Sequence, residues 1–423
     1  MGEFTQFILN HENDDVTRLL LGASKYPDID IKKAVIIINA RKKIKSKIPS
    51  WYQIPSLKYP QSLSVEQCSS ESTARYKAKI LNHIFTKSNI QGNVNTDSSL
   101  VVKPAEQLRI ADITGGLGVD SYFFSQEAEK VFYFERDQEL TDTARHNFNE
   151  LNITNISVKS TDIQKDNLNT LERLNINAIY LDPARRGNHG EKVYSIKDCE
   201  PNILELKDEL FKIVQIIMVK ISPMADISKT IELLPETRRV DIISSGNECK
   251  EVLLTLIKKT KTLENQIKIH AVNIYKNDTQ DFVFSPDEEK ITNPSIVTLE
   301  DINQFSYLYE PNKSILKAGA FKLPAIRYDI KKIAINTHLY LSSDIKENFP
   351  GKCFKILKVL EYKKATIKLI KSDYPNASIT ARNFPLSSDN LRKKLKLNES
   401  NKYHIFACSL DDASKWIFIT ERI

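Results

Sequence analysis

The chain has 423 residues, a formal net charge of +7 and 41% hydrophobic residues. At roughly 100–200 residues per domain this length predicts two to four domains, and the apolar fraction excludes a disordered chain. The longest apolar run near the N-terminus, residues 34–38, is far shorter than the ~20 residues that cross a bilayer. No basic-then-apolar leader opens the sequence, and the five cysteines contain no C-x-x-C pair, which argues against a disulfide framework and a zinc site. We therefore expect a cytoplasmic protein that needs no metal.

Residues 1–60 carry apolar side chains at helical spacing, with breaks at Pro27 and Pro49, which predicts an N-terminal helical region. A further helix is expected from about Ser70 to Phe85. From Leu108 onward, strand-like and helical segments alternate at short spacing. Such alternation predicts βαβ units and a parallel sheet that is covered on both faces, so the fold class is α/β. We assign this domain, with its leading helix, to residues 61–258.

Strand-like segments joined by polar turns follow residue 258. We expect a small strand-rich domain at 259–323, with strands at 268–275, 281–285 and 296–299. A small α/β module is expected at 324–423. In this module we predict strands at 353–362, 365–373, 402–410 and 415–422, and a capped helix at 387–397.

Basic residues are concentrated near the C-terminus. Residues 321–423 hold 20 Lys and Arg against 10 Asp and Glu, a net charge of +10, so the first 320 residues are net acidic. Such asymmetry predicts a surface that binds phosphate groups, although a Lys-rich proteome would produce the same excess. Four cations interleave with leucines on the predicted helix at 387–397 and form its basic face: Arg392, Lys393, Lys394 and Lys396. This face is either a surface that binds RNA or a solvated helix surface.

Glycine is scarce, with 11 in the whole chain, against a usual share of ~7%. Three of them, Gly115, Gly116 and Gly118, fall within four residues, between a buried strand and a helix. An open α/β sheet binds nucleotide-like ligands at this position, and glycine lets a ligand approach the backbone. The dinucleotide fingerprint would require a glycine where Ser121 stands, which weakens that alternative.

Four carboxylates follow consecutive predicted strands: Asp112, Glu135, Asp162 and Asp182. Because the carboxyl ends of parallel strands meet at one edge, we expect these side chains to converge. Glu135 is placed to accept from both hydroxyls of a ribose, and Asp162 to accept from an adenine amino group. An acid-lined site suits a cationic cofactor such as S-adenosylmethionine (SAM), whereas the pyrophosphate of NAD favours a helix N-terminus. Taken singly, each acid also suits a helix N-cap or a turn.

These segments resemble class I SAM-dependent methyltransferases, and more closely the bacterial methyltransferase family that carries a C-terminal THUMP-like domain. The match rests on "LSVEQCSSESTARYKA", on the cofactor loop "ADITGGLGVDS" and on "YLDPARRG". The stretches "NFPLSSDNLRKKLKL" and "YHIFACSL" resemble the THUMP-like module. The resemblance runs from about Ser64 to the C-terminus. It implies a Rossmann-like sheet that binds SAM, a ferredoxin-like domain at 259–323 and a THUMP-like, RNA-binding domain at 324–423.

Carried over position by position, the resemblance also implies individual roles. The cofactor site would be formed by Asp112, Thr114, Gly115, Gly116, Gly118, Asp120, Glu135, Asp162 and Asp182. Thr114 replaces the first glycine of the common loop, so its hydroxyl would make a contact that the backbone usually makes. Gln67 and Ser69 match a segment that lies near the cofactor or the substrate in related enzymes.

The motif "DPAR" departs from the Asp-Pro-Pro-aromatic pattern of amino methyltransferases. In those enzymes the Asp side chain and a Pro carbonyl accept from the target NH2, and the aromatic ring stacks on the base. Arg185 stands at the aromatic position here, and a guanidinium both stacks on bases and binds phosphate. We expect Asp182 to accept from the nucleophile, Pro183 to shape the turn, and Arg185 and Arg186 to hold the substrate.

"DPAR" also occurs in RNA uridine C5-methyltransferases, whose chemistry requires a cysteine nucleophile after the next strand. The equivalent stretch, "MVKISPMAD", has no cysteine, which argues against that mechanism. The preferred hypothesis is transfer of a methyl group from SAM to a base of RNA, by alignment of the nucleophile with the methyl carbon. Two alternatives remain: an RNA-binding scaffold that retains the cofactor fold without catalysis, and methylation of a protein or a small molecule.

Overall fold

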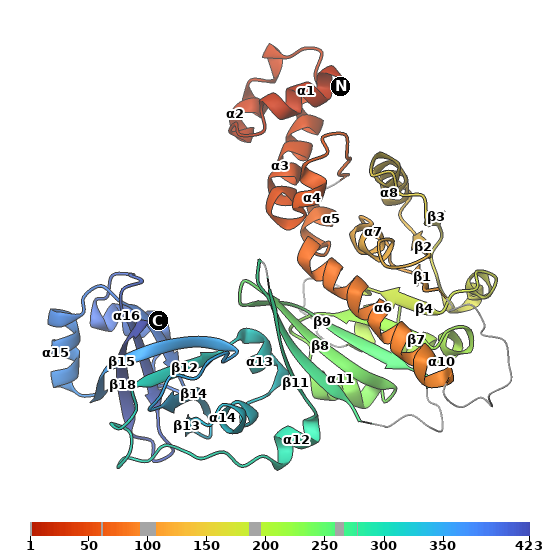
Figure 1. Ribbon diagram of the computed structural model, residues 1–423. Helices are drawn as coiled ribbons and strands as arrows, with labels where there is room; N and C mark the ends of the chain where they lie inside the picture. Colours follow the sequence, from red (N-terminus) through yellow and green to blue (C-terminus); the bar gives the residue numbers. More distant parts are fainter. Residues whose placement is uncertain (1, 61, 94–106, 186–195, 259–265, 277) are drawn as a thin grey trace. The chain divides into compact units, whose positions relative to one another are not determined.

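Two units make up the part of the chain that the computed structural model describes, namely residues 2–60, 62–93, 107–185, 196–258, 266–276 and 278–423 (Figure 1). One unit consists of residues 1–239 and 251–265, and the other of residues 240–250 and 266–423. The chain therefore leaves the first unit, returns to it for one short segment and leaves it again. Among the described helices, none combines the length and the apolarity that a membrane span requires.

Short helices form the N-terminal region, as the spacing of its apolar residues predicts. They are α1 (Glu3–Asn10), α2 (Val16–Leu21), the 3-10 turn η1 (Ala23–Lys25), α3 (Ile31–Lys47) and α4 (Pro49–Tyr52). Asp15 and Asp30 accept backbone N–H groups at the starts of α2 and α3, which satisfies donors that the helix leaves unpaired. Pro49 opens α4, where its missing N–H costs nothing. The apolar faces pack around Phe7 and Ile38.

Two helices lead from this region to the sheet of the first unit: α5 (Ser62–Gln67) and α6 (Glu71–Asn93). Helix α6 begins where the sequence predicts and continues past Phe85. It packs against α7 (Val119–Phe124) and buries Ala74, Ala78 and Leu81. One charged side chain, that of Lys77, is also fully buried on α6.

A parallel sheet forms the centre of the first unit and confirms the predicted α/β fold. Its strands are β1 (Arg109–Asp112), β2 (Lys130–Glu135), β3 (Ile156–Ser160), β4 (Ala178–Leu181) and β7 (Ile216–Ile221), followed by β9 (Glu248–Ile257). The order is β9-β7-β4-β1-β2-β3, and only the β7–β9 pair is antiparallel. Strand β4 is buried along its whole length, because neighbouring strands and helices cover it on all sides.

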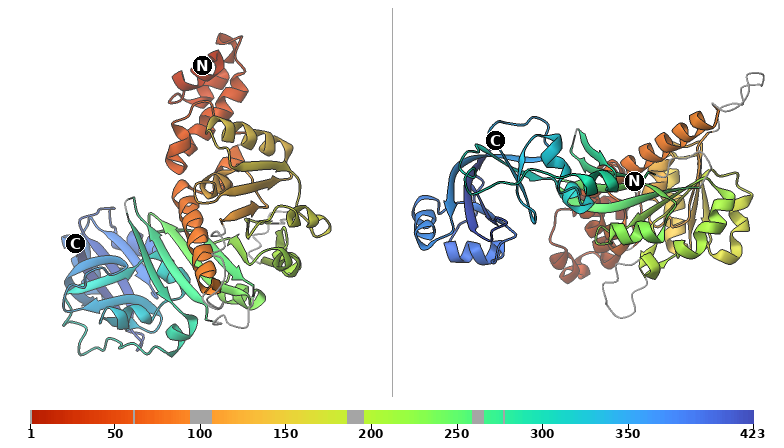
Figure 2. Two further views of the ribbon diagram at one scale, coloured as in Figure 1. Left: turned by 45° about the vertical axis from the view of Figure 1, so that its right-hand side comes forward. Right: turned by 90° about the horizontal axis from the view of Figure 1, so that it is seen from below.

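Helices connect successive strands and cover the sheet. After α7 they are α8 (Gln138–Glu150), α9 (Asn169–Glu172), α10 (Ile203–Ile213) and α11 (Ile227–Leu233). In Figure 2, the orange α6 lies on one face of this sheet, and α10 and α11 lie on the other. The loop after β4 contributes a short antiparallel pair, β5 (Ala184–Arg185) with β6 (Cys199–Glu200). The carboxyl ends of β1, β2, β3 and β4 therefore form one edge, at which the predicted acids stand.

The second unit is rich in strands. Its strands β10 (Lys268–Ile274) and β11 (Thr279–Phe284) form an antiparallel pair, and β8 (Thr237–Ser245) lies next to β10. A separate sheet has the order β13-β14-β12-β15-β18-β17-β16. Its strands are β12 (Tyr307–Pro311), β13 (Lys331–Ala334), β14 (Thr337–Ser342), β15 (Gly351–Glu361), β16 (Ser378–Arg382), β17 (His404–Ser409) and β18 (Lys415–Arg422). This sheet confirms the small α/β module that the sequence predicts at the C-terminus.

Helices α12 (Pro286–Ile291), α13 (Lys313–Ala318), α14 (Leu323–Arg327), α15 (Lys364–Asp373) and α16 (Ser388–Leu395) accompany these strands. Two predictions in this unit were wrong. Residues 365–373 form α15 instead of a strand, because Thr366 and Ile370, four residues apart, are buried together. Residues 296–299 make a single bridge from Ile296 to Lys332 instead of a strand.

The N-terminus of α14 is held by a carboxylate from α12. The backbone N–H groups of Phe321, Lys322 and Leu323 donate to the Glu289 carboxylate at 3.0, 2.8 and 3.1 Å. A carboxylate at this position satisfies donors that the helix cannot pair and interacts favourably with the helix dipole.

The Glu289→Ala variant should therefore lower the free energy of unfolding of the second unit by about 1–3 kcal/mol, because three backbone donors lose their acceptor. Chemical denaturation followed by circular dichroism measures this change. Glu347→Ala, which removes an exposed carboxylate of the same unit, should change stability by less than about 0.5 kcal/mol. Equal stability of the two variants would contradict the capping role.

Candidate active site

The glycine turn between β1 and α7 is anchored by Asp112. Its buried carboxylate accepts from the backbone N–H of Thr114 at 3.1 Å and from the Ser121 hydroxyl at 2.6 Å. These bonds join the end of β1 to the turn and to the helix that follows. Burial raises the pKa of Asp112 to about 7, with smaller contributions from the negative charges of Asp120 and Asp182. Asp112 therefore holds the turn in place through hydrogen bonds on its buried side.

Two of the three glycines in the turn are required by the protein's own aromatic rings. A Cβ atom on Gly115 would lie 2.2 Å from the Tyr133 ring, and one on Gly118 would lie 2.7 Å from the Phe148 ring. Gly118 also has a φ of +85°, which side chains rarely adopt. Gly116 differs, because a Cβ there would meet only the Thr114 carbonyl oxygen, at 3.9 Å. Of the three glycines, Gly116 is the one with an open side.

Glu135, at the end of β2, lies directly beside Gly116. One carboxylate oxygen accepts from the Gly116 N–H at 2.8 Å, and the other accepts from the Asp137 N–H at 2.9 Å. The Tyr133 hydroxyl donates to the Gly116 carbonyl at 2.6 Å, so both backbone groups of Gly116 are held. The structure therefore brings Glu135 to the glycine turn, as the sequence led us to expect.

Asp162 and Asp182 follow β3 and β4, the strands on the two sides of the β1–β2 pair. Asp162 follows β3, is exposed, and accepts from Gln164 Nε2 at 3.0 Å within its own loop. Asp182 follows β4, and its backbone N–H donates to the Thr114 hydroxyl at 2.6 Å. Thr114 thus uses its hydroxyl to connect the turn after β1 to the end of β4. The side chain of Asp182 is 37% exposed.

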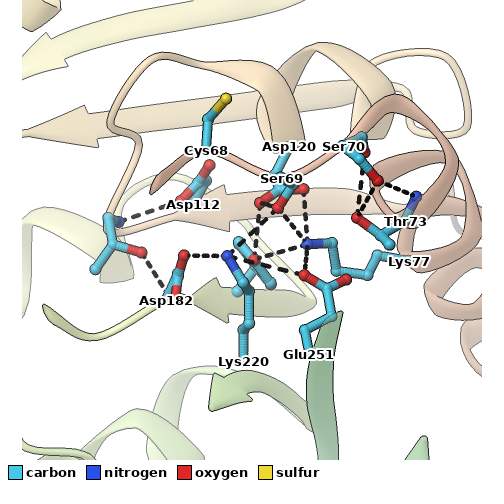
Figure 3. Close-up of polar contacts among 12 residues, drawn as sticks. Cys68, Ser69, Ser70, Thr73, Lys77, Asp112, Asp120, Asp182, Lys220 and Glu251 are labelled. Atoms are coloured by element: carbon cyan, nitrogen blue, oxygen red, sulfur yellow. Dashed lines mark hydrogen bonds and ion pairs between the residues drawn. The ribbon is translucent and has the colours of Figure 1, made fainter. Parts of the chain in front are cut away.

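Asp120, predicted in the cofactor site, belongs to a buried charged cluster. Its carboxylate lies 2.9 Å from Lys77 Nζ and accepts from the Ser69 hydroxyl at 2.8 Å and the Tyr180 hydroxyl at 2.9 Å (Figure 3). Burial alone would raise the pKa of Asp120, but the charges of Lys77 and Lys220 outweigh burial and lower it. Because Asp120 is the first-turn acid of α7 and α6 packs against that turn, its nearest cation comes from α6.

Three members of this cluster were missed from the sequence: Lys77, Lys220 and Glu251. Lys77 is fully buried, donates to Ser69 at 2.7 Å and lies 3.2 Å from Glu251. Lys220, near the end of β7, lies 2.5 Å from Asp182 and 3.8 Å from Glu251. Burial alone would lower the pKa of Lys220, but the charges of Asp182 and Glu251 raise it above its ordinary value.

A weak signal for two of these residues was present. Lys220 is the one charged residue in the buried strand "IIMVKI", and Lys77 shares a helical face with Ala74 and Leu81. A charge among apolar positions implies a buried partner. The sequence alone does not identify that partner, because Glu251 lies 174 residues beyond Lys77.

The remaining predicted site residues lie as follows. Ser69 is inside the charged cluster, where it donates to Asp120 and accepts from Lys77, whereas Gln67 is exposed at the end of α5. Pro183 is buried two residues after the end of β4, and Arg185 lies in β5, paired with Cys199. Arg186 lies outside the described residues.

The basic residues of the C-terminal helix belong to the second unit. Leu391 and Leu395 are fully buried on one side of α16, and Lys393 and Lys394 are exposed. Arg392 pairs with Glu399 at 3.3 Å. Lys396 is exposed, but it caps the helix in a left-handed conformation with a φ of +55°. The helix therefore ends at Leu395, one residue before the last of the four cations predicted on its basic face.

Comparisons with known proteins agree with this architecture. Residues 307–350 match a family model described as a ferredoxin-like domain, and residues 351–422 match one described as THUMP domain-like. The solved structure of a "putative methyltransferase" from Porphyromonas gingivalis W83 is 29% identical and has a TM-score of 0.83, over 99% of this chain and 97% of that one. No curated protein matches the sequence.

Two further solved structures match a smaller part of the chain. An rRNA methylase from Streptococcus thermophilus is 15% identical over 38% of this chain and all of that one, with a TM-score of 0.27. TrmK of M. capricolum, solved with S-adenosyl-homocysteine, is 13% identical over 37% of this chain and 66% of that one, with a TM-score of 0.28. The parallel sheet, the match of residues 351–422 and the likeness over the whole chain to the Porphyromonas gingivalis structure together show a class I methyltransferase fold with a C-terminal THUMP-like module.

Proposed function

We propose that this protein is a SAM-dependent methyltransferase that acts on RNA. The observation that carries the proposal is the arrangement at Gly116, which has an open side and lies within hydrogen-bond distance of Glu135. The end of β4, which carries Asp182, is joined to the same turn through Thr114. Carboxylates at the ends of β2 and β4, the two strands that flank β1, thus stand beside the half-buried Gly116. The assignment of the individual domains remains a prediction, as does the cytoplasmic location.

The charges around this edge suit a cation. Carboxylates outnumber ammonium groups here, with Asp120, Glu135, Asp182 and Glu251 against Lys77 and Lys220. SAM carries a sulfonium and an ammonium group, and when bound it supplies an electrophilic methyl group. Glu135 would hold the ribose hydroxyls, Asp162 the adenine amino group, and Gly116 would lie against the ligand. The residues present therefore fit this cofactor.

RNA as the substrate is supported by the charge of the second unit. Residues 321–423 carry a net charge of +10, and Lys393 and Lys394 are exposed on α16, with Lys394 Nζ 5.3 Å from the centre of the Tyr362 ring. Exposed cations on one helix face attract a phosphate backbone. The match of residues 351–422 to the THUMP domain-like family supports the same substrate class.

The Glu135→Gln variant tests the cofactor site. Loss of the negative charge should weaken the binding of S-adenosylhomocysteine by about tenfold, or about 1.4 kcal/mol, because the neutral amide is a weaker acceptor for ribose hydroxyls. Isothermal titration calorimetry measures this change. Glu139→Gln, an exposed glutamate in the first turn of α8, is the matched control and should bind as the natural protein does. Absence of binding by the natural protein would refute the SAM assignment.

A triple variant of α16 tests the RNA-binding surface. Replacement of Arg392, Lys393 and Lys394 by Gln should weaken the binding of total bacterial RNA and reduce the slope of log K against log salt by roughly 2–3, because each lost phosphate contact removes ~0.7–0.9 from that slope. Filter binding between about 50 and about 200 mM salt measures both quantities.

The control for this experiment removes the same charge from the exposed residues Lys25, Lys32 and Lys33 of the N-terminal region. It should leave the affinity and the slope unchanged. Equal effects of the two triple variants would show that α16 contributes only net charge and has no specific role in binding.

A further inference from the structure

Lys220 and Asp182 form an ion pair at the open edge of the sheet. Leu181 of β4 lies opposite Val219 of the neighbouring strand β7, and Asp182 and Lys220 are the residues that come next in each chain segment. Lys220 Nζ lies 2.5 Å from Asp182 Oδ2 (Figure 3). The side chain of Lys220 is 13% exposed and that of Asp182 is 37% exposed, so the pair is reachable from solvent on the Asp182 side. It is therefore placed to meet a substrate.

The charged cluster fixes Lys220 from behind. Lys220 Nζ donates to the Ser69 hydroxyl at 3.4 Å and lies 3.8 Å from Glu251, which is 3% exposed. Glu251 in turn contacts the fully buried Lys77, which is paired with Asp120. The groups that face Lys220 are thus carboxylates from β4, α7 and β9, together with one ammonium group from α6. This surrounding keeps Lys220 charged and in one position.

The ion pair restricts which nucleophile Asp182 can serve. An amino group that attacks a methyl carbon becomes positively charged, and a fixed ammonium group beside it would repel that charge. In addition, Lys220 donates to one of the two Asp182 oxygens, so that oxygen already has a partner when the nucleophile arrives. A hydroxyl oxygen has the opposite requirement, because it gains negative charge as its proton leaves. A fixed ammonium group stabilises that charge.

Building on the proposed function, we propose that the methyl acceptor is the ribose 2′-hydroxyl of RNA, with Lys220 as a catalytic residue that donates to the attacking oxygen. The 2′-hydroxyl is the alcohol that each internal RNA nucleotide carries. Lys77 and Glu251 are positioning residues, which hold Lys220 in place through the cluster. This assignment replaces the RNA base that the motif "DPAR" had suggested.

The reaction balances with the groups present and a methyl sulfonium donor. A carbon–oxygen bond forms as the carbon–sulfur bond breaks, and the electron pair of the broken bond remains on sulfur. The hydroxyl proton passes to the Asp182 carboxylate and from there to water. Lys220 keeps its protons throughout and contributes only charge and a hydrogen bond.

Identification of the product tests the proposal. Total RNA from cells that lack this protein is incubated with the purified protein and methyl-labelled SAM, then hydrolysed with alkali. Ribose methylation blocks cleavage at the next phosphate, so the label should appear in alkali-resistant dinucleotides. Label in base-methylated mononucleotides would overturn the ribose assignment and leave the proposed function intact. Absence of label from any RNA would overturn both.

The Lys220→Met variant, which keeps the length of the side chain and removes its charge, tests the role of Lys220. Turnover should fall by about 10²–10³-fold, while calorimetric binding of S-adenosylhomocysteine stays within about threefold and shows that the site is folded. Lys220→Arg should recover part of the lost turnover. Lys212→Met, an exposed lysine of α10, is the control. Turnover of Lys220→Met equal to that of the natural protein would remove Lys220 from catalysis.

The positioning role of Glu251 predicts a change in the pH profile. Because Asp182 and Glu251 raise the pKa of Lys220, Glu251→Gln should lower that pKa and make activity fall at an alkaline pH at which the natural protein remains active. Glu248→Gln, at the exposed start of the same strand, should leave the profile unchanged. An unshifted profile in Glu251→Gln would show that Glu251 only supports the fold.

Discussion

A lysine ammonium group that is removed from water must be surrounded by acceptors, and Lys77 imposes this constraint on the first unit. Its side chain is fully buried and contacts Ser69, Asp120 and Glu251. These partners come from the segment before α6, from α7 and from β9. Removal of one partner of a buried ion pair typically costs ~3–5 kcal/mol, because the remaining charge stays buried without compensation. The need to neutralise one ammonium group therefore holds together elements that are far apart in the sequence.

The glycine turn and the charged cluster perform different tasks at the same edge. The turn is shaped from within by Tyr133 and Phe148, which leave no room for side chains at Gly115 and Gly118. Gly116 is left with an open side. The cluster begins on the other side of Asp182, where Lys220 adds a positive charge to an edge that is otherwise acidic. A site with a cation-binding half and an ammonium group next to it is suited to bringing a cationic donor and an oxygen nucleophile together.

The sequence predicted the fold well, because alternating buried strands and helices have few possible arrangements. It also placed the acids that follow the strands at one edge of the sheet, because the carboxyl ends of parallel strands all lie at the same edge. The position of Asp120 in the motif does not reveal that α6 supplies a lysine beside it. Lys220 and Glu251 were missed because hydrophobic periodicity cannot show which charges are buried in pairs. Residues 365–373 were taken for a strand because alternating and helical spacing coincide over so short a segment.

The return of the chain to the first unit after residue 250 has a consequence for how the protein is made. The chain emerges from the ribosome N-terminus first, and Glu251 lies 174 residues after Lys77. The sheet of the first unit can start to assemble once β7 has emerged, but the ammonium group of Lys77 has only part of its counter-charge until β9 arrives. The nascent protein therefore completes its charged cluster only after residues 240–250 of the second unit have been made.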